Sequence, residues 1–393
     1  MSPSSFIVAH AANADWQAAL DDCVAQLAPQ LAARQEGGRM VEYTLGWCYL
    51  TDHLAADAEN IVHGLNRRLP GMTWVGTVGL GVAANGREHF DEPALALMIA
   101  PLPAHAFRLF SGRQPLHPGT GGFQPCTALV HADGSTPDLQ ELLQELAERT
   151  ATGYLFGGLS AARNRNLQIA GEVFDGGLSG VAFDAGVGVL SRVTQGCQPV
   201  GPLRTITHAQ ENYVIALDGQ PALSCALDDL GLAGDLPLDI TAQALAGTLV
   251  GLCADEEDLA LAPGLFGPDT RVRHIIGLDP QQQVLAVADE VAPGMQLAFC
   301  RRDPDAALAD LVRIASEIRA ELASTGRQAA GALYVSCTGR GGAHFGAPHA
   351  EARALREVFG EDLPLVGFYA AGEIARDRLY GYTGVLTVFA TTA

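Results

Sequence analysis

The 393-residue chain contains no lysine, because all 24 of its basic residues are arginine. Without lysine there is no side chain to form a Schiff base, to anchor pyridoxal phosphate, biotin or lipoate, or to bind phosphate in a Walker-type loop. The sequence therefore excludes these enzyme classes. It also leaves arginine as the only fixed side-chain cation for an anionic ligand.

Positive charge and long apolar runs are scarce as well. The 24 arginines face 44 acidic residues, which gives a net charge of −20 at pH 7. Such a chain repels polyphosphate backbones, so we predict neither nucleic acid nor an anionic membrane as a partner. No apolar run reaches the roughly 18 residues of a membrane span. The first 16 residues lack the basic region and apolar stretch of a signal peptide, so we expect a cytoplasmic protein without membrane insertion.

Common catalytic and metal-binding motifs are missing too. The sequence has no H-E-x-x-H, G-x-S-x-G, P-loop or complete G-x-G-x-x-G pattern, and its eight cysteines form no C-x-x-C pair. His344 and His349 are the only close histidine pair, and their spacing suits one helix face poorly. We therefore predict no metal, no cofactor and eight free thiols.

Hydrophobic residues make up 48% of the chain and charged residues 17%, which is typical of a compact globular protein. Apolar periodicity and start signals predict helices over 15–33 and 54–69, and helices that begin at Thr136-Pro137 and at Asp303-Pro304. Short β-branched or alternating runs predict strands at 41–48, 73–78, 94–100, 126–131, 212–217, 272–277, 283–289, 332–337 and 383–390. Helices and strands alternate, so the fold class is mixed α and β.

One pattern recurs along the chain. The segments WVGTVGLG (74–81) and LVGFYAAG (365–372) carry glycine pairs with the same spacing, and each follows a strand that ends near Cys48 or Cys337. A weaker third copy includes YLFGGLS (154–160). The repeat predicts a layered sandwich of mixed β-sheets covered by helices and built from β-α-β-β-like units. The stretch 223–262, helical by pattern and ending in an acidic run at 255–258 that suggests a solvated loop, is predicted to be an insertion or a domain joint.

The loop after the strand ending at Cys337 is the first candidate ligand site. Gly339, Gly341 and Gly342 let the backbone approach a ligand. The planar guanidinium of Arg340 can form two parallel hydrogen bonds with a carboxylate or phosphate. A plain glycine-rich turn with a solvated arginine is the alternative.

The second candidate follows the matching strand of the same repeat. Glu373 stands among apolar residues, where an unpaired carboxylate is costly. It should therefore be paired, face solvent or bind the amine of a ligand, and Arg340 and Arg376 are its possible structural partners. Cys337 as a nucleophile with His344 as its base is an enzymatic alternative.

Several stretches resemble a known family. Residues 195–202 (QGCQPVGP), 205–207 (TIT) and 217–222 (LDGQPA), with Asn212, resemble the end of a FIST N domain and its passage into FIST C. The C-terminal segments CTGRG, LVGFYAAGEI and YGYTGVL strengthen the resemblance, which spans nearly the whole chain. It implies a FIST N-like domain over 1–217 and a FIST C-like domain over 218–393.

The resemblance also implies a function. FIST proteins look like sensory modules of signal transduction, proposed to recognise small molecules such as amino acids, and similar bacterial proteins often join the module to an output domain. We expect a module that binds an amino acid or another small carboxylate and acts on a partner protein in trans. The predicted ligand-binding residues are Cys337, Gly339, Arg340, Gly341, Gly342, Tyr369 and Glu373. A cysteine-dependent enzyme using Cys337 and a protein-binding scaffold remain the alternatives.

Overall fold

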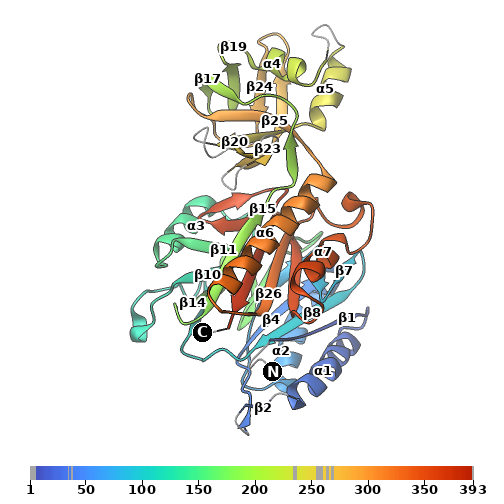
Figure 1. The fold of residues 1–393 in the computed structure, drawn as a ribbon, viewed down its shortest axis with the longest axis vertical. Helices are drawn as coiled ribbons and strands as arrows, with labels where there is room; N and C mark the ends of the chain where they lie inside the picture. Colours follow the sequence, from blue (N-terminus) through green and yellow to red (C-terminus); the bar gives the residue numbers. More distant parts are fainter. Residues whose placement is uncertain are drawn as a thin grey trace. The chain divides into compact units, whose positions relative to one another are not determined.

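Three copies of one strand–helix–strand arrangement form most of the fold. The computed structural model describes residues 6–33, 35–36, 39–232, 237–253, 260–262, 265–266 and 270–391 (Figure 1). The first repeat comprises β4 (Leu45–Thr51), α2 (Ala58–Arg68), β5 (Thr73–Gly79), β6 (Gly81–Ala84), β7 (Arg87–Phe90) and β8 (Ala94–Ala100). The second comprises β10 (Thr127–Ala132), α3 (Leu139–Glu148), β11 (Tyr154–Leu159), β12 (Leu167–Ala170), β13 (Glu172–Asp175) and β14 (Leu178–Phe183). The third comprises β26 (Ala329–Cys337), α7 (Ala350–Phe359), β27 (Leu365–Ala370), β28 (Glu373–Arg376), β29 (Arg378–Tyr380) and β30 (Gly384–Ala390).

Each repeat builds the centre of one six-stranded sheet. The first two strands of every repeat pair in parallel, and the last strand pairs antiparallel with the first. One further strand borders each last strand: β1 (Ile7–Ala12) on β8, β9 (Phe107–Ser111) on β14, and β15 (Gly188–Thr194) on β30. The mixed α and β class and the repeated units are confirmed.

The hairpin of each repeat belongs to the sheet of another repeat. The hairpin β6–β7 pairs with β27, β12–β13 pairs with β5, and β28–β29 pairs with β11. The exchange is cyclic, so each sheet is completed by residues from a different repeat. Functional groups from distant parts of the chain therefore meet where a hairpin joins its host sheet.

The three sheets share one apolar core and carry helices on their outer faces. That core takes aromatic side chains from every sheet, among them Trp47, Phe183 and Phe368. On the outer faces, α1 (Trp16–Ala32) and α2 cover the first sheet, α3 the second, and α6 (Pro304–Ser324) and α7 the third. Figure 1 shows α6 and α7 in front of β26. This arrangement is the predicted layering of helices on mixed sheets.

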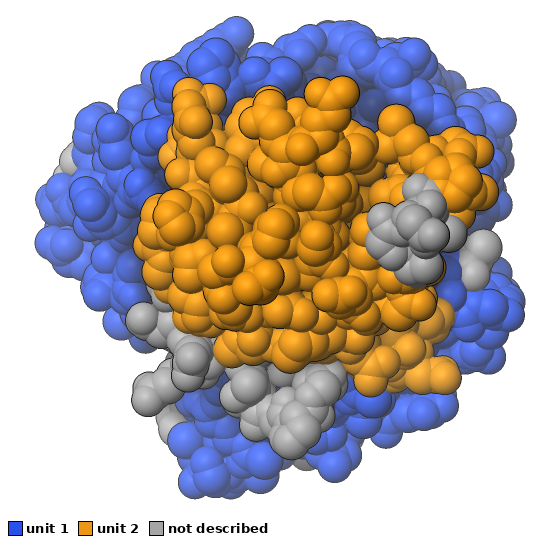
Figure 2. Space-filling view, turned by 90° about the horizontal axis from the view of Figure 1, so that it is seen from above, with its two compact units in different colours: residues 1–194, 308–393 blue, residues 195–307 orange. Residues whose placement is uncertain are grey.

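Residues 195–307 form a separate compact unit, and residues 1–194 with 308–393 form the other (Figure 2). Six strands of the smaller unit close into a ring in the order β25, β17, β18, β24, β23, β20 and back to β25. They are β17 (Arg204–Gln210), β18 (Tyr213–Leu217), β20 (Leu249–Cys253), β23 (Arg271–Asp279), β24 (Val284–Val287) and β25 (Gln296–Arg302). Also in this unit are β16 (Cys197–Pro199), β19 (Gln220–Pro221), α4 (Ala222–Asp229), α5 (Leu238–Ala246), β21 (Ala260–Ala262) and β22 (Leu265–Phe266).

The remaining short elements described in the larger unit are β2 (Gln35–Glu36), β3 (Arg39–Met40) and the short 3-10 helices η1 (Asp52–Asp57), η2 (Thr120–Gly122) and η4 (Gly342–Phe345). Among the described residues, no helix combines the length and the apolar content that crossing a bilayer requires.

Some predicted details were wrong. Within 223–262, the apolar run Leu249–Cys253 is the strand β20, because a short buried apolar run fits a strand as well as a helix. The helix expected from Thr136 begins at Leu139 after Asp138. The strand expected to end near Cys48 continues to Thr51. The acidic run at 255–258 lies outside the described residues. The predicted domain boundary at 217/218 falls between β18 and β19 of the smaller unit and stays a prediction.

Candidate functional site

The predicted ligand-binding residues meet at one end of the third sheet. Because β26 and β27 run in parallel, their last residues, Cys337 and Ala370, lie side by side. Gly339, Arg340, Gly341 and Gly342 follow β26, Tyr369 lies near the end of β27, and Glu373 begins β28. We call the side chains of Cys337, Arg340, Glu351, Tyr369 and Glu373 the strand-end cluster. The topology thus brings together residues that the sequence separates by up to 36 positions.

Arg340 is buried, with 1% of its surface exposed, and it already holds a carboxylate of its own chain. Its Nε and Nη2 donate to Oε1 of Glu351 at 3.0 and 2.9 Å. The same carboxylate accepts hydrogen bonds from the Tyr334 hydroxyl at 2.6 Å and the Ser336 hydroxyl at 2.8 Å. The pair therefore fixes α7, which carries Glu351, on the sheet. A ligand carboxylate could take the Nε and Nη2 donors that Arg340 gives to Glu351 only by displacing Glu351.

Glu373 is fully buried, and its hydrogen bonds come from Thr383 rather than from an arginine. The Thr383 N–H and hydroxyl donate to Oε2 at 3.1 and 2.7 Å. Burial raises the pKa of Glu373 to about 8, although the Thr383 hydrogen bonds and the charge of Arg340 act in the opposite direction. Near neutral pH most molecules therefore carry Glu373 as a neutral carboxylic acid.

Cys337 lies beside Glu373, with 8% of its surface exposed. Burial and the neighbouring Glu373 raise the pKa of the Cys337 thiol to about 12. A thiol, not a thiolate, is present at neutral pH, and a thiol is a weak nucleophile. These surroundings disfavour the cysteine-dependent enzyme.

The protonation of Glu373 gives a testable pH dependence of stability. The folded chain keeps this proton up to about pH 8, whereas the unfolded chain loses it near its ordinary pKa of about 4.5. Between these values the folded state binds more protons, so its free energy of unfolding should fall as the pH rises. Urea unfolding at about pH 5 and about pH 8 should show a smaller decrease for Glu373→Gln than for the wild type. The same decrease in both proteins would contradict a buried, protonated Glu373.

Gly341 and Tyr369 form a close contact with the exchanged hairpin β6–β7. The Phe90 ring from β7 lies 4.2 Å from the Tyr369 ring, centre to centre. A Cβ atom on Gly341 would overlap the Phe90 ring, so any larger residue here would require that ring to move. The hydroxyl of Tyr369 is buried near the Glu88 carboxyl group of the same hairpin. The first repeat therefore contributes directly to the site of the third.

A pocket of about 550 Å³ lies next to the strand-end cluster, and we call it the strand-end pocket. Its lining residues are Glu88, Phe90, Glu92, Gly342, Gly346, Ala347, Pro348 and His349. Of the seven predicted residues only Gly342 lines it. Neither lysine nor arginine is among the lining residues, so its charge is set by the two glutamates.

The hydrogen bonds around Glu88 fix the polar wall of this pocket. Oε1 of Glu88 accepts from the Ala352 N–H at 3.1 Å, at the start of α7, and the Glu88 N–H donates to Nδ1 of His349 at 3.0 Å. Burial raises the pKa of Glu88, and burial lowers the pKa of His349, so His349 is neutral at pH 7. Glu92 bonds to Nδ1 of His89 at 2.6 Å. Acidic and neutral groups thus face the pocket.

Sequence reasoning missed Glu351, Glu88 and Phe90. A glutamate in the first turn of a predicted helix usually faces solvent, and nothing local indicates that Glu351 is buried. Glu88 and Phe90 reach the site only through the hairpin exchange. Among the described residues, no group of three histidine, cysteine, aspartate or glutamate side chains is arranged to hold a metal ion.

Comparison with known proteins agrees with the resemblance seen in the sequence. The FIST N domain matches residues 44–220, and the FIST C domain matches residues 226–376. The chain belongs to the FIST family. FIST domains are associated with sensory roles in signal transduction. The FIST N match ends inside the smaller compact unit, and the FIST C match continues into the larger one, so each match contributes to both units.

Two relatives of this FIST chain come from mycobacteria. An uncharacterized protein of Mycobacterium bovis is 31% identical over 336 residues, which cover 80% of this chain and 82% of the relative. An uncharacterized protein of Mycobacterium tuberculosis strain H37Rv is 29% identical over 330 residues, which cover 80% of this chain and 83% of the relative. Both similarities extend over most of the FIST chain.

Proposed function

We propose that this FIST protein is a cytoplasmic sensory module that binds a small molecule, an amino acid or a related compound, and acts on a signalling partner in trans. The strand-end pocket is the proposed binding site. The observation that carries the proposal is the acidic, partly apolar pocket beside the strand-end cluster. Its volume falls in the range of roughly 300–1,000 Å³ that is typical of small-molecule sites.

The pocket lining suggests how an amino acid would be oriented. The amine would face Glu88 and Glu92, because carboxyl groups are the only charged groups on the lining. The side chain would pack on Phe90 and Pro348. The carboxylate would lie toward the backbone N–H groups of Gly341 and Gly342, because the Arg340 N–H already donates to the Cys337 carbonyl at 2.8 Å. The guanidinium of Arg340 adds positive charge nearby, while it keeps its hydrogen bonds to Glu351 and the Tyr382 carbonyl.

In this orientation, the binding affinity depends on the charged hydrogen bond between the ligand amine and Glu88. A calorimetric and thermal-shift screen should find an amino acid that binds, while the same compound without its amine should bind at least about tenfold more weakly, because a charged hydrogen bond is lost. Glu88→Gln should weaken binding of the amino acid by a similar factor.

Glu357→Gln is the matched control, because Glu357 lies exposed on α7 and undergoes the same change of charge. It should bind the amino acid as the wild type does. Equal affinity of wild type and Glu88→Gln, or no binding of any amino acid, would disprove the assignment of this pocket.

A protein-binding scaffold is the second candidate. Tyr213 and Ile215 on β18 and Ile276 on β23 expose 48%, 38% and 59% of their surface, which is unusual for large apolar side chains of one sheet. A scaffold would not require the amine-dependent binding described above, so the same screen separates the two candidates.

A further inference from the structure

Two histidine side chains from different sheets lie against each other near the strand-end pocket. His10 lies on β1 of the first sheet, and His89 lies on β7, the hairpin strand that joins the third sheet. Nδ1 of His10 is 3.0 Å from Nε2 of His89, and the ring centres are 5.1 Å apart. We call these two side chains the histidine pair. Because 79 positions separate them in the chain, no spacing motif in the sequence indicates the pair.

The Glu92 carboxylate determines which nitrogen of His89 carries a proton. Oε1 of Glu92 lies 2.6 Å from Nδ1 of His89, and a carboxylate can only accept a hydrogen bond, so Nδ1 carries the N–H. In the neutral ring, Nε2 of His89 then has a free lone pair, and this nitrogen is the one that faces His10. A carboxylate that accepts from the other ring nitrogen is the usual outer partner of a metal-binding histidine.

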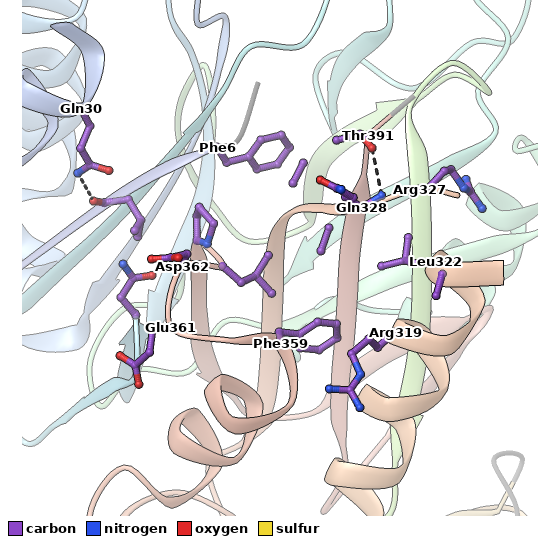
Figure 3. A pocket seen from close by; sticks show the side chains of 17 residues that line it. Phe6, Gln30, Arg319, Leu322, Arg327, Gln328, Phe359, Glu361, Asp362 and Thr391 are labelled. Atoms are coloured by element: carbon purple, nitrogen blue, oxygen red, sulfur yellow. Dashed lines mark hydrogen bonds between the residues drawn. The ribbon is translucent and has the colours of Figure 1, made fainter. Parts of the chain in front are cut away.

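Two glutamines of α1 hold the backbone of β1 in place. Nε2 of Gln26 donates to the His10 carbonyl at 2.8 Å, and Oε1 of Gln26 accepts from the His10 N–H at 3.3 Å. One turn further along α1, Nε2 of Gln30 donates to the Val8 carbonyl at 2.9 Å, which is the dashed line beside Gln30 in Figure 3. The backbone that carries the His10 ring is therefore fixed before any ligand binds.

The separation of the two nitrogens also fits a shared metal ion. Without an ion, His10 donates its Nδ1–H to Nε2 of His89, and one proton satisfies both nitrogens. When the proton of His10 moves to its Nε2, two lone pairs face one another. Bonds from histidine nitrogen to ions such as zinc are about 2.0–2.1 Å long, so one ion can reach both nitrogens. The two bonds then meet at about a right angle, as in the tetragonal sites of nickel and copper.

Solvent reaches the histidine pair from the side of His10. His89 is 5% exposed, whereas His10 is half-buried, so water can complete the coordination of an ion there. The exposed Arg87 is a positive neighbour of His10, and the partly exposed Glu92 is a negative neighbour of His89. Water screens both charges, so binding depends on the two imidazoles rather than on net charge.

We propose that the histidine pair binds a divalent transition-metal ion of the nickel, copper and zinc class. Nδ1 of His10 and Nε2 of His89 are its protein ligands, and Glu92 is the outer partner that orients His89. Imidazole is a preferred ligand of these metals, whereas magnesium and calcium prefer oxygen ligands. The bound ion joins β1 of the first sheet to the exchanged strand β7. The proposal does not depend on the function proposed for the strand-end pocket, although Glu92 also lines that pocket.

Isothermal titration calorimetry with Ni²⁺ as the probe tests this proposal. The wild type should bind Ni²⁺, and an excess of Mg²⁺ should not displace it. His10→Asn and His89→Asn should each weaken Ni²⁺ binding by at least about tenfold, because losing even an outer partner of a metal ligand usually costs about 10–100-fold in affinity. His63→Asn, which changes an exposed histidine on α2, should leave the affinity unchanged.

Glu92→Leu should weaken Ni²⁺ binding by about tenfold, because His89 loses the partner that fixes its tautomer. Two variants separate this site from the proposed function. Glu88→Gln should keep Ni²⁺ binding, and His10→Asn should keep amino acid binding at the strand-end pocket. Loss of Ni²⁺ binding in Glu88→Gln would place the ion in the strand-end pocket and overturn the proposal. Equal Ni²⁺ affinities of the wild type, His10→Asn and His89→Asn would overturn it as well, as would a wild type that binds no Ni²⁺.

Discussion

Replacing Arg340 by methionine should lower the free energy of unfolding by about 3–5 kcal/mol, the usual cost of leaving one member of a buried ion pair without its partner. Glu351 is 1% exposed, and without Arg340 its carboxylate keeps only the hydroxyls of Tyr334 and Ser336 as donors. Methionine preserves most of the apolar stem, so lost charge dominates the effect. Urea unfolding of the two proteins at pH 7 measures the difference.

The double variant with Arg340→Met and Glu351→Met separates the buried charge from lost packing. Removing both partners leaves no uncompensated charge, and exchanging a buried ion pair for apolar side chains is often close to neutral. The double variant should therefore be more stable than Arg340→Met alone. Equal stability of the two variants would contradict the ion-pair explanation and assign the loss to packing around α7.

The sequence predicted the right kind of partner for Arg340 but not its source. A planar guanidinium in a glycine-rich loop indicates a carboxylate, and the structure supplies Glu351, eleven residues later in the chain. The burial of Glu351 depends on how α7 packs on β26, which local sequence does not determine. The role of the seven predicted residues in binding a ligand stays a prediction, while their proximity is established.

The repeats could be predicted because their glycines recur with the same spacing in the local sequence. No local sequence pattern indicates the exchange of the hairpins. Val82 in β6 pairs with Phe368 in β27, a partner 286 residues away, and no periodicity within either segment indicates that pairing. Glu88 and Phe90 lie on the second strand of the same hairpin. The acidic wall of the strand-end pocket therefore could not be predicted from the sequence, whereas the glycine-rich loop beside it could.

The recurring glycines have a common structural cause. Gly76, Gly157 and Gly367 each lie opposite a residue of the parallel neighbouring strand, namely Cys48, Val130 and Tyr334. At all three positions an added Cβ would overlap the carbonyl oxygen of that opposite residue. The overlap involves backbone on both sides, so a change of rotamer cannot relieve it.

Gly367→Ala should therefore destabilise the fold by about 3 kcal/mol or more, at the upper end of the cost of overpacking, because β27 must move away from β26 to admit the methyl group. Gly112→Ala is the matched control: a Cβ there meets no atom within 4 Å, so its stability should stay within about 0.5 kcal/mol of the wild type. Urea unfolding of both variants measures the contrast. Since the end of β27 also positions Tyr369 and the start of β28, Gly367→Ala should disturb ligand binding at the strand-end pocket even where the protein remains folded. A Gly367→Ala protein as stable as Gly112→Ala would show that the sheet admits a side chain here, and the repeated glycines would then need another explanation.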